Sequence, residues 1–153
     1  MTPQIKKTFN PDGGLFSIEI YENNKRNGLC KWYYENGNVE AEVNFKEDKR
    51  EGSYKSFYEN GIIWQEANYA EDELQGRVKW YYENGTLAAE VEYDKGNLNG
   101  LSCWYYENGT KKLEEHYING KLDGHCIAYE QNGEILFDDE YQDGTKIQSI
   151  QYK

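Results

Sequence analysis

Proline, histidine and cysteine are scarce in this 153-residue chain, which has two prolines, two histidines and three cysteines. Both prolines, Pro3 and Pro11, lie near the start. Because proline cannot donate a backbone hydrogen bond, its absence from the rest of the chain leaves that region free to pair in sheets. Cys30, Cys103 and Cys126 are odd in number and have no metal-ligand spacing. We therefore expect reduced thiols in a cytoplasmic protein.

Positive charge is also in short supply, with 17 Lys and Arg against 28 Asp and Glu and a net charge of −11. No Lys/Arg cluster is dense enough to bind a phosphate backbone, so we expect no nucleic-acid partner. No apolar run approaches the roughly 20 residues that span a bilayer, and anionic membrane surfaces repel an acidic chain. The start of the chain also lacks the apolar stretch of a secretory signal. The sequence therefore predicts a soluble protein without a membrane partner.

Aromatic residues and glycines are abundant and regularly spaced. The chain has 15 Tyr, 4 Trp and 5 Phe, and rings suit the half-buried surface of strands. Two series of glycines recur every 24 residues. They are Gly13, Gly37, Gly61, Gly85, Gly109 and Gly133, and Gly28, Gly52, Gly76, Gly100 and Gly124. A fixed period of this length indicates a repeat protein, whose small units bury their apolar faces by stacking on neighbours.

One repeat, residues 76–99, has two strand-like segments on either side of Asn84-Gly85. Asn-Gly between alternating apolar runs is a strong hairpin signal. A second turn-rich piece, residues 94–97, returns the chain to the next glycine. The sequence therefore predicts an all-β fold, an elongated array of about five to six stacked antiparallel hairpins in a single meandering sheet.

The repeat leaves two hairpin registers open. A two-residue loop at Asn84-Gly85 pairs Tyr82 with Leu87, Trp80 with Ala89, Val78 with Val91 and Lys79 with Glu90. This register gives the sheet one apolar face and one face with cross-strand ion pairs. The segment Asn10-Pro11-Asp12-Gly13 instead favours a three-residue loop with a left-handed glycine, which would swap the faces of the second strand.

The expected ion pairs change along the chain. In the two-residue register, Lys31 with Glu42 and Lys55 with Glu66 repeat the pairing of Lys79 with Glu90. Cys103 and Ile127 then stand opposite Glu114 and Asp138 without a lysine. We therefore expect the charge pairing to fade towards the C-terminus.

The repeats divide the chain into a single domain, residues 1–153. We expect an N-terminal cap and partial repeat at 1–27, five repeats of 24 residues at 28–147, and a closing strand at 148–153. Gln148 replaces the glycine that the period predicts there. Atypical terminal repeats are usual in such proteins because they protect the open ends of the stack.

The recurring unit reads Trp-Tyr-Tyr-Glu-Asn-Gly, then Glu five residues after the glycine, an aromatic at eight and Gly at fifteen. It occurs at 32–52, in altered form at 56–76, and at 80–100 and 104–124. This unit resembles the MORN-repeat variant, in the form found in bacterial YwqK-type antitoxins, over about residues 9–141. The resemblance implies stacked β-hairpins and a binding scaffold without catalytic residues. In some bacterial relatives it also implies a proposed antitoxin or immunity role. Ser56 and Ala128 depart from the pattern because they replace the tryptophan.

The candidate partner-binding residues are the rings on the predicted apolar face. They are Trp32, Tyr34, Tyr58, Trp80, Tyr82, Trp104 and Tyr106, with Trp64 out of register. Trp and Tyr are favoured binding hot spots, and a contiguous exposed aromatic band indicates an interaction site. In the alternative interpretation, these rings only cover one face of a single-layered sheet.

Acidic residues form two further columns. Glu42, Glu66, Glu90, Glu114 and Asp138 should lie ~10 Å apart, too far to share one metal ion. We expect them to form structural ion pairs or contacts with the backbone of the turns. The turn residues Glu35, Glu59, Glu83 and Glu107 mark a solvated edge that would steer a basic protein. His116 and His125 have no recurring nucleophile beside them, so we expect no catalytic site, metal or cofactor.

Together these features predict a non-catalytic protein-binding scaffold. Its most specific form is an antitoxin or immunity protein that neutralises a basic toxin by steric occlusion. The alternative is a structural role, in which the chain self-associates as a homo-oligomer or serves as a generic interaction module.

Overall fold

The computed structural model describes residues 2–152, which form β-strands and turns with every strand pair antiparallel. Met1 and Lys153, the ends of the predicted domain, lie outside the described residues. The contacts cluster into two compact units, unit 1 (Met1–Glu73) and unit 2 (Leu74–Lys153). The finer division into cap, repeats and closing strand stays a prediction. None of the described residues belongs to a helix long and apolar enough to cross a membrane.

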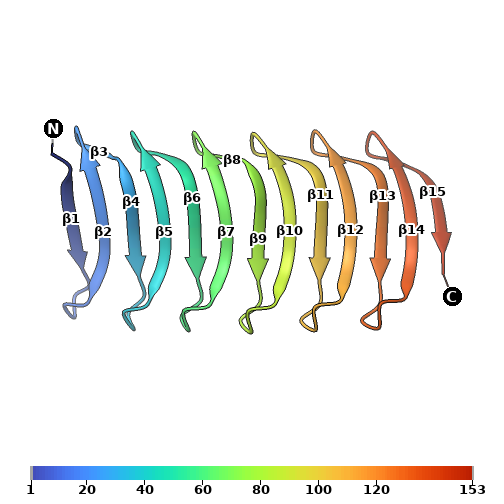
Figure 1. The fold of residues 1–153 in the computed structure, drawn as a ribbon, viewed down its shortest axis with the longest axis horizontal. Coiled ribbons are helices and arrows are strands. Elements are labelled where there is room, and N and C mark those ends of the chain that lie inside the picture. Colours follow the sequence, from blue (N-terminus) through green and yellow to red (C-terminus); the bar gives the residue numbers. More distant parts are fainter. Residues whose placement is uncertain (1, 153) are drawn as a thin grey trace. The chain divides into compact units, whose positions relative to one another are not determined.

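Unit 1 is a meander in which neighbouring strands follow the chain (Figure 1). Its strands are β1 (Gln4–Phe9), β2 (Leu15–Glu22), β3 (Lys25–Arg26), β4 (Gly28–Tyr33), β5 (Val39–Lys46), β6 (Lys49–Phe57) and β7 (Ile63–Ala70). The short β3 pairs with the end of β2. A further two-residue strand, β8 (Glu73–Leu74), spans the boundary of the units.

Unit 2 repeats the same arrangement (Figure 1). Its strands are β9 (Gly76–Tyr81), β10 (Leu87–Asp94), β11 (Asn97–Tyr105), β12 (Lys111–Ile118), β13 (Lys121–Tyr129), β14 (Ile135–Gln142) and β15 (Thr145–Gln151). In each unit the Asn-Gly turns lie at one end of the strands and the second series of turns at the other (Figure 1). The predicted all-β architecture of stacked antiparallel hairpins is confirmed.

The Asn-Gly turns contain three residues, so the expected two-residue loop is wrong. In unit 2 the Tyr82 N–H donates to the Thr86 carbonyl and the Gly85 N–H donates to the Tyr82 carbonyl, both at 2.8 Å. Gly85 has a φ of 83°, whereas Asn84 stays outside the left-handed region. This geometry is a type I turn closed by a left-handed glycine. Asn84 contributes its side chain instead, because its Oδ1 accepts the Thr86 N–H at 2.8 Å.

A β-bulge behind each turn restores the register that the two-residue loop predicted. Leu87 pairs with Tyr81 rather than Tyr82, and the ladder then shifts by one residue at Ala88. Beyond the shift, Trp80 pairs with Ala89 and Lys79 pairs with Glu90, as predicted. The extra residue of the turn and the extra residue of the bulge compensate, so the faces of the second strand are not swapped.

The sheet of each unit has two faces, one apolar and one charged. The apolar face carries Cys30, Trp32, Ala41 and Val43 in unit 1 and Val78, Trp80, Ala89 and Val91 in unit 2. The charged face carries Lys31, Glu42, Lys55 and Glu66 in unit 1 and Lys79, Glu90, Glu114 and Asp138 in unit 2. The predicted separation into one apolar and one ion-paired face is therefore confirmed.

The last strand departs from the repeat because Gln148 stands where a glycine is expected. In β13 the left-handed Gly124 shifts the ladder, so that Cys126 pairs with Glu115. In β15 the shift is one residue smaller, and Ser149 rather than Ile150 lies opposite Asp139. The buried Asp139 carboxylate accepts a hydrogen bond from Ser149 Oγ and one from Lys146 Nζ at 3.0 Å. A polar cluster thus ends the apolar face of unit 2.

Candidate protein-binding surface

The apolar face buries small side chains beneath larger rings. In unit 1, Cys30, Val43 and Phe45 are buried, and Trp32 packs against them with its ring centroid 6.2 Å from that of Phe45. In unit 2, Val78 is fully buried and Trp80 is half-buried. A sheet without a covering layer buries its centre in this way, because large rings shield their smaller neighbours. Trp32 therefore helps form the core.

The candidate tyrosines connect successive repeats. The Tyr34 hydroxyl donates to the Phe57 carbonyl at 2.6 Å. In unit 2, the Tyr82 hydroxyl donates to the Tyr105 carbonyl at 2.6 Å, and the Tyr106 hydroxyl donates to the Tyr129 carbonyl at 2.9 Å. Tyr58 has the same repeat position and is half-buried.

These hydrogen bonds fix the orientation of the rings. Burial and the nearby carboxylates of Glu40 and Glu59 raise the pKa of Tyr34. The hydroxyl is therefore neutral at physiological pH and able to donate. A partner would meet rigid, half-buried ring surfaces here, which lose little conformational entropy on binding.

Tryptophan exposure differs among the repeats. The side chains of Trp104 and Trp64 leave 43% and 44% of their surface exposed, whereas Trp32 and Trp80 are half-buried. Ser56, which replaces the tryptophan of its repeat, is buried, and its Oγ has no hydrogen-bond partner among the described atoms. Trp104 and Trp64 are therefore the tryptophans most available to a partner.

The β-bulges create a further column that sequence reasoning missed, except for the observation that Trp64 is out of register. The bulge residues are Phe16, Glu40 and Trp64 in unit 1 and Ala88, Lys112 and Leu136 in unit 2. Each follows its turn glycine by three residues, which is the signal that would have identified it. The Nζ atom of Lys112 lies 5.5 Å from the ring centroid of Tyr106. Within each unit, we name the bulge residues and the candidate tyrosines together the turn-proximal band of that unit.

The turn edge beside this band is acidic. Glu35, Glu59, Glu83 and Glu107 are all exposed. Asn36 Nδ2 donates to the Glu59 carbonyl at 2.9 Å, and Asn108 Nδ2 donates to the Gln131 carbonyl at 3.2 Å. These bonds join consecutive turns through backbone acceptors and leave the carboxylates facing solvent. The edge therefore presents negative charge next to aromatic surface.

The charged face consists largely of ion pairs. Lys31 Nζ lies 2.6 Å from Glu42, and the hydrogen bond to that carboxylate raises the pKa of Lys31. The equivalent N–O distances are 2.9 Å for Lys55 with Glu66 and 3.2 Å for Lys79 with Glu90. The acidic column predicted to form structural ion pairs therefore does so in these repeats.

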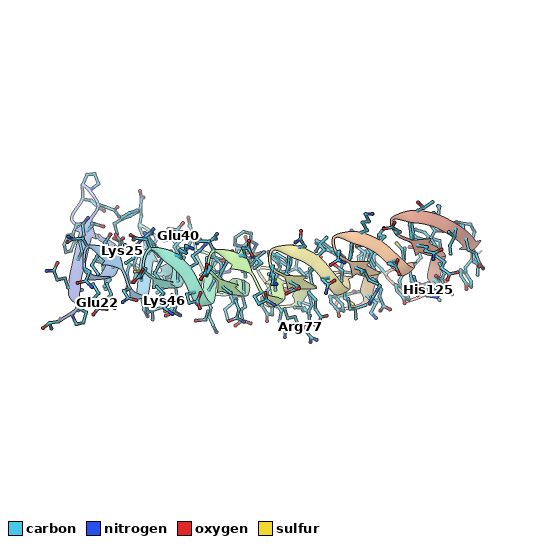
Figure 2. All side chains as sticks on the ribbon, turned by 90° about the horizontal axis from the view of Figure 1, so that it is seen from above. Glu22, Lys25, Glu40, Lys46, Arg77 and His125 are labelled. Carbon is cyan, nitrogen blue, oxygen red and sulfur yellow. The ribbon has the colours of Figure 1, made fainter. Side chains whose placement is uncertain are left out.

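The ion pairs near the C-terminus fade less than expected, because Lys111 supplies a cation for Glu114 and His125 supplies Asp138 with a side chain that is charged when protonated. Cys103 and Ile127 do pair with Glu114 and Asp138, as predicted. However, Lys111 forms an ion pair with Glu114, and His125 Nδ1 lies 2.8 Å from Asp138. Figure 2 shows Arg77 and His125 on the same side of the ribbon in unit 2.

The cysteines and histidines, which could in principle act in catalysis or metal binding, have structural roles. Burial raises the pKa of the Cys30 and Cys103 thiols and, more strongly, that of Cys126 to about 11. These thiols are protonated at neutral pH and are weak nucleophiles. His116 Nδ1 lies 2.7 Å from the Asp123 carbonyl oxygen. In residues 2–152 no three His, Cys, Asp or Glu side chains gather in a group that could hold a metal ion.

A family model described as the MORN repeat variant matches residues 26–47, 50–71, 74–95 and 98–119, which together make up more than half of the chain. A comparison with curated proteins finds no match. Repeats of this kind generally mediate protein interactions, which agrees with the aromatic and acidic surfaces described above. The chain therefore belongs to the family of proteins built from the MORN repeat variant.

Proposed function

We propose that this protein is a non-catalytic scaffold that acts as an antitoxin or immunity protein, binding a basic toxin and blocking it sterically. The observation that supports this most directly is the exposure of Trp64 in unit 1 and of Trp104 in unit 2, at 44% and 43%, in units whose turn glutamates are also exposed. Large rings beside solvated charge are typical of a binding surface with an aromatic centre and a polar rim.

In the proposed mechanism, negative charge speeds association and the exposed aromatic rings provide affinity. The net charge of −11 and the acidic turn edge accelerate the encounter with a basic protein. Exposed rings then supply affinity, because burying them removes apolar surface from water. The resemblance to YwqK-type antitoxins supports the toxin as partner. No cofactor, metal, nucleic acid or membrane takes part.

The proposal also places the protein in the cytoplasm. Cys30, Cys103 and Cys126 are unpaired and buried. Free thiols of this kind are usual in a reducing compartment. A protein that neutralises a toxin inside the cell that makes it would work in this compartment.

A second candidate function is self-assembly, which the edge strands favour. In β1, Ile5 and Phe9 are 66% and 61% exposed, and in β15, Ile147 is 56% exposed. Apolar residues on an edge strand can promote pairing with another chain. A mass in light scattering that rises with protein concentration would favour this candidate over a separate toxin.

The decisive test captures partners with the native protein and with Trp64→Ala and Trp104→Ala variants, each first checked for folding by circular dichroism. Leu101→Ala is the matched control, because Leu101 is also 44% exposed but lies on the charged face. The captured protein is then expressed alone and together with each variant, and growth is measured.

The proposal predicts a basic partner that arrests growth alone, is neutralised by the native chain and by Leu101→Ala, and escapes one or both tryptophan variants. A captured partner without toxicity would overturn the antitoxin role. Equal capture by all variants would move the binding surface away from the tryptophans.

A further inference from the structure

We propose that Phe16, Glu40 and Trp64 of unit 1 form a three-point docking site for an amphipathic helix of the partner protein. The helix would present an apolar, a basic and a second apolar side chain at positions i, i+7 and i+14. This inference rests on the proposed protein-binding function and specifies what that surface recognises.

The three residues share one structural position. Each is the bulge residue of its hairpin, next to a shift in the ladder between β1 and β2, β4 and β5, or β6 and β7. Phe16 and Trp64 are both 44% exposed, and Glu40 is exposed as well. The side chain is released from the cross-strand pairing that occupies its neighbours. This column can therefore vary from repeat to repeat without disturbing the sheet.

The residues beside this column are held firmly. Tyr34 is fixed by its hydrogen bond to the Phe57 carbonyl. Burial and, secondarily, the negative charge of Glu40 raise the pKa of Tyr34. Figure 2 shows Glu40 on the opposite side of the ribbon from Lys46. The site therefore combines a rigid base with three different exposed side chains.

The spacing of the column selects a helix. Consecutive bulge residues are separated by two strands, or about 10 Å. Seven residues of an α-helix advance about 10.5 Å and return the side chain to nearly the same face. An extended peptide covers the same distance in about three residues. Because its side chains alternate, the side chain at i+3, which should meet the central residue, then points away from the surface. A helix crossing the strands therefore fits, and an extended segment does not.

The acidic residues near Glu40 favour a basic residue at the central position, i+7, of the partner helix. Glu40 has exposed Glu35 and Glu59 as its acidic neighbours along the turn edge. The cations Lys25, Arg26, Lys49 and Arg50 form ion pairs with acidic residues of the second turn series. A central Lys or Arg on the helix would therefore meet uncompensated negative charge. A second copy of the chain does not fit, because residues 2–152 contain no helix.

The test displays two libraries of an idealised single helix and selects them against the immobilised full chain. One library randomises positions i, i+7 and i+14, and the other randomises i, i+4 and i+8. We expect the native chain to enrich the first library for an apolar, a Lys or Arg, and an apolar residue. Selection on Glu40→Lys should exchange the central preference for Asp or Glu, and Trp64→Ala should lower the affinity of selected helices about tenfold.

Three results of the helix selection would overturn the inference. These are no enrichment over Trp64→Ala, a central preference that Glu40→Lys leaves unchanged, or better enrichment from the i, i+4, i+8 library. A dimer that Trp64→Ala dissociates would also overturn it, because a second copy would then cover the site. Loss of toxin capture by Trp104→Ala together with failed helix selection would leave the proposed function standing and remove this inference alone. Successful helix selection with a non-toxic natural partner would support this inference and overturn the antitoxin role.

Discussion

Units 1 and 2 build the second series of turns in different ways. Unit 1 places Glu47-Asp48 and Glu71-Asp72 in the left-handed region, with φ between 51° and 74°. Unit 2 uses Lys95-Gly96, Asn119-Gly120 and Asp143-Gly144 at the same repeat positions. The backbone bond is the same in both, since the Asp72 N–H donates to the Arg50 carbonyl at 3.0 Å and the Gly96 N–H to the Leu74 carbonyl at 2.9 Å.

Unit 1 compensates for the missing glycines with contacts to the preceding repeat. The Asp72 carboxylate accepts the Arg50 backbone N–H at 2.9 Å and its Nε–H at 3.0 Å, and the guanidinium lies 4.0 Å from the Tyr69 ring centroid. The backbone hydrogen bond is the main cause of the lowered pKa of Asp72. A left-handed non-glycine residue costs roughly 1–2 kcal/mol. The same turn can thus be stabilised by glycine itself or by tertiary contacts that offset this strain.

The largest expected loss of stability comes from alanine substitutions at two glycines, Gly100 in unit 2 and Gly28 in unit 1. Both have φ above 100°, but a Cβ on Gly100 would lie 2.2 Å from Glu92 Oε2, whereas one on Gly28 would lie 3.5 Å from Ile20. We expect Gly28→Ala to lower the free energy of unfolding by about 1–3 kcal/mol through backbone strain. Gly100→Ala should lower it slightly more, because the flexible end of Glu92 can move away but its Cβ, 3.2 Å from the new methyl group, must also shift. Urea denaturation measures both. Adding Glu92→Ala to Gly100→Ala should remove part of the excess, and equal losses without it would contradict the clash.

The next effect transfers the turn of unit 1 into unit 2. Gly96→Asp creates a left-handed aspartate opposite Leu74, where unit 1 has an arginine. We expect the free energy of unfolding to fall by about 1–2 kcal/mol. Leu74→Arg added to Gly96→Asp should recover part of this loss, as measured in a double-mutant cycle. The absence of coupling would show that the arginine contacts do not offset the strain.

A smaller effect concerns the two positions that lack the tryptophan. Ser56 in unit 1 and Ala128 in unit 2 are both buried, but only Ser56 brings a hydroxyl, and its Oγ has no partner among the described atoms. Because an unpaired buried hydroxyl costs about 1–3 kcal/mol, Ser56→Ala should raise the free energy of unfolding by up to about 1 kcal/mol. Thermal unfolding tests this, with Ser17→Ala as the control. Ser17 Oγ bonds to Thr8 Oγ1 at 2.6 Å, so its removal should destabilise.

The smallest effect is a difference in pH dependence on the charged face. The hydrogen bond to Asp138 raises the pKa of His125, whereas Lys31 in unit 1 is charged throughout the neutral range. The contribution of His125 should be complete below about pH 6.5, its unfolded pKa, and should be lost as pH rises through the higher folded value. The stability difference between native protein and His125→Gln should therefore shrink between about pH 5.5 and 8.5. The effect of Lys31→Gln should stay constant.

The repeat allowed much of the fold to be predicted from sequence. The pairs Trp80 with Ala89 and Lys79 with Glu90 were correct, because alternating residue types require one face to be apolar and the other charged. The turn was wrong, since Asn-Gly fits either loop length and only the bulge at Ala88 reconciles the loop with the register. The counter-charges from Lys111 and His125 also escaped prediction, because neither is the directly paired residue in the ladder.

The candidate site was only partly accessible from sequence. The columns placed Trp104 on the same face as its ladder partners Ala89 and Leu113, but they gave no measure of exposure. Tyr34 is tied to the next repeat, whereas Trp104 stays 43% exposed. Exposure depends on neighbouring repeats that shield each ring, and it differs between repeats with similar sequences. Whether these residues contact a partner stays a prediction.

The sequence by itself determined the hairpin period, the antiparallel pairing and the division into two faces, because glycine spacing and side-chain alternation act locally along the backbone. Only the tertiary structure decided which side chains have a hydrogen-bond partner and which lie outside the cross-strand pairing. Repeat stacking directs the Tyr34 hydroxyl to a carbonyl, buries Ser56 without a partner and leaves the bulge residues Glu40 and Trp64 outside the ladder. The Tyr34 hydrogen bond joins residues 23 apart, and the bulges follow from the geometry of each turn, neither of which side-chain alternation specifies.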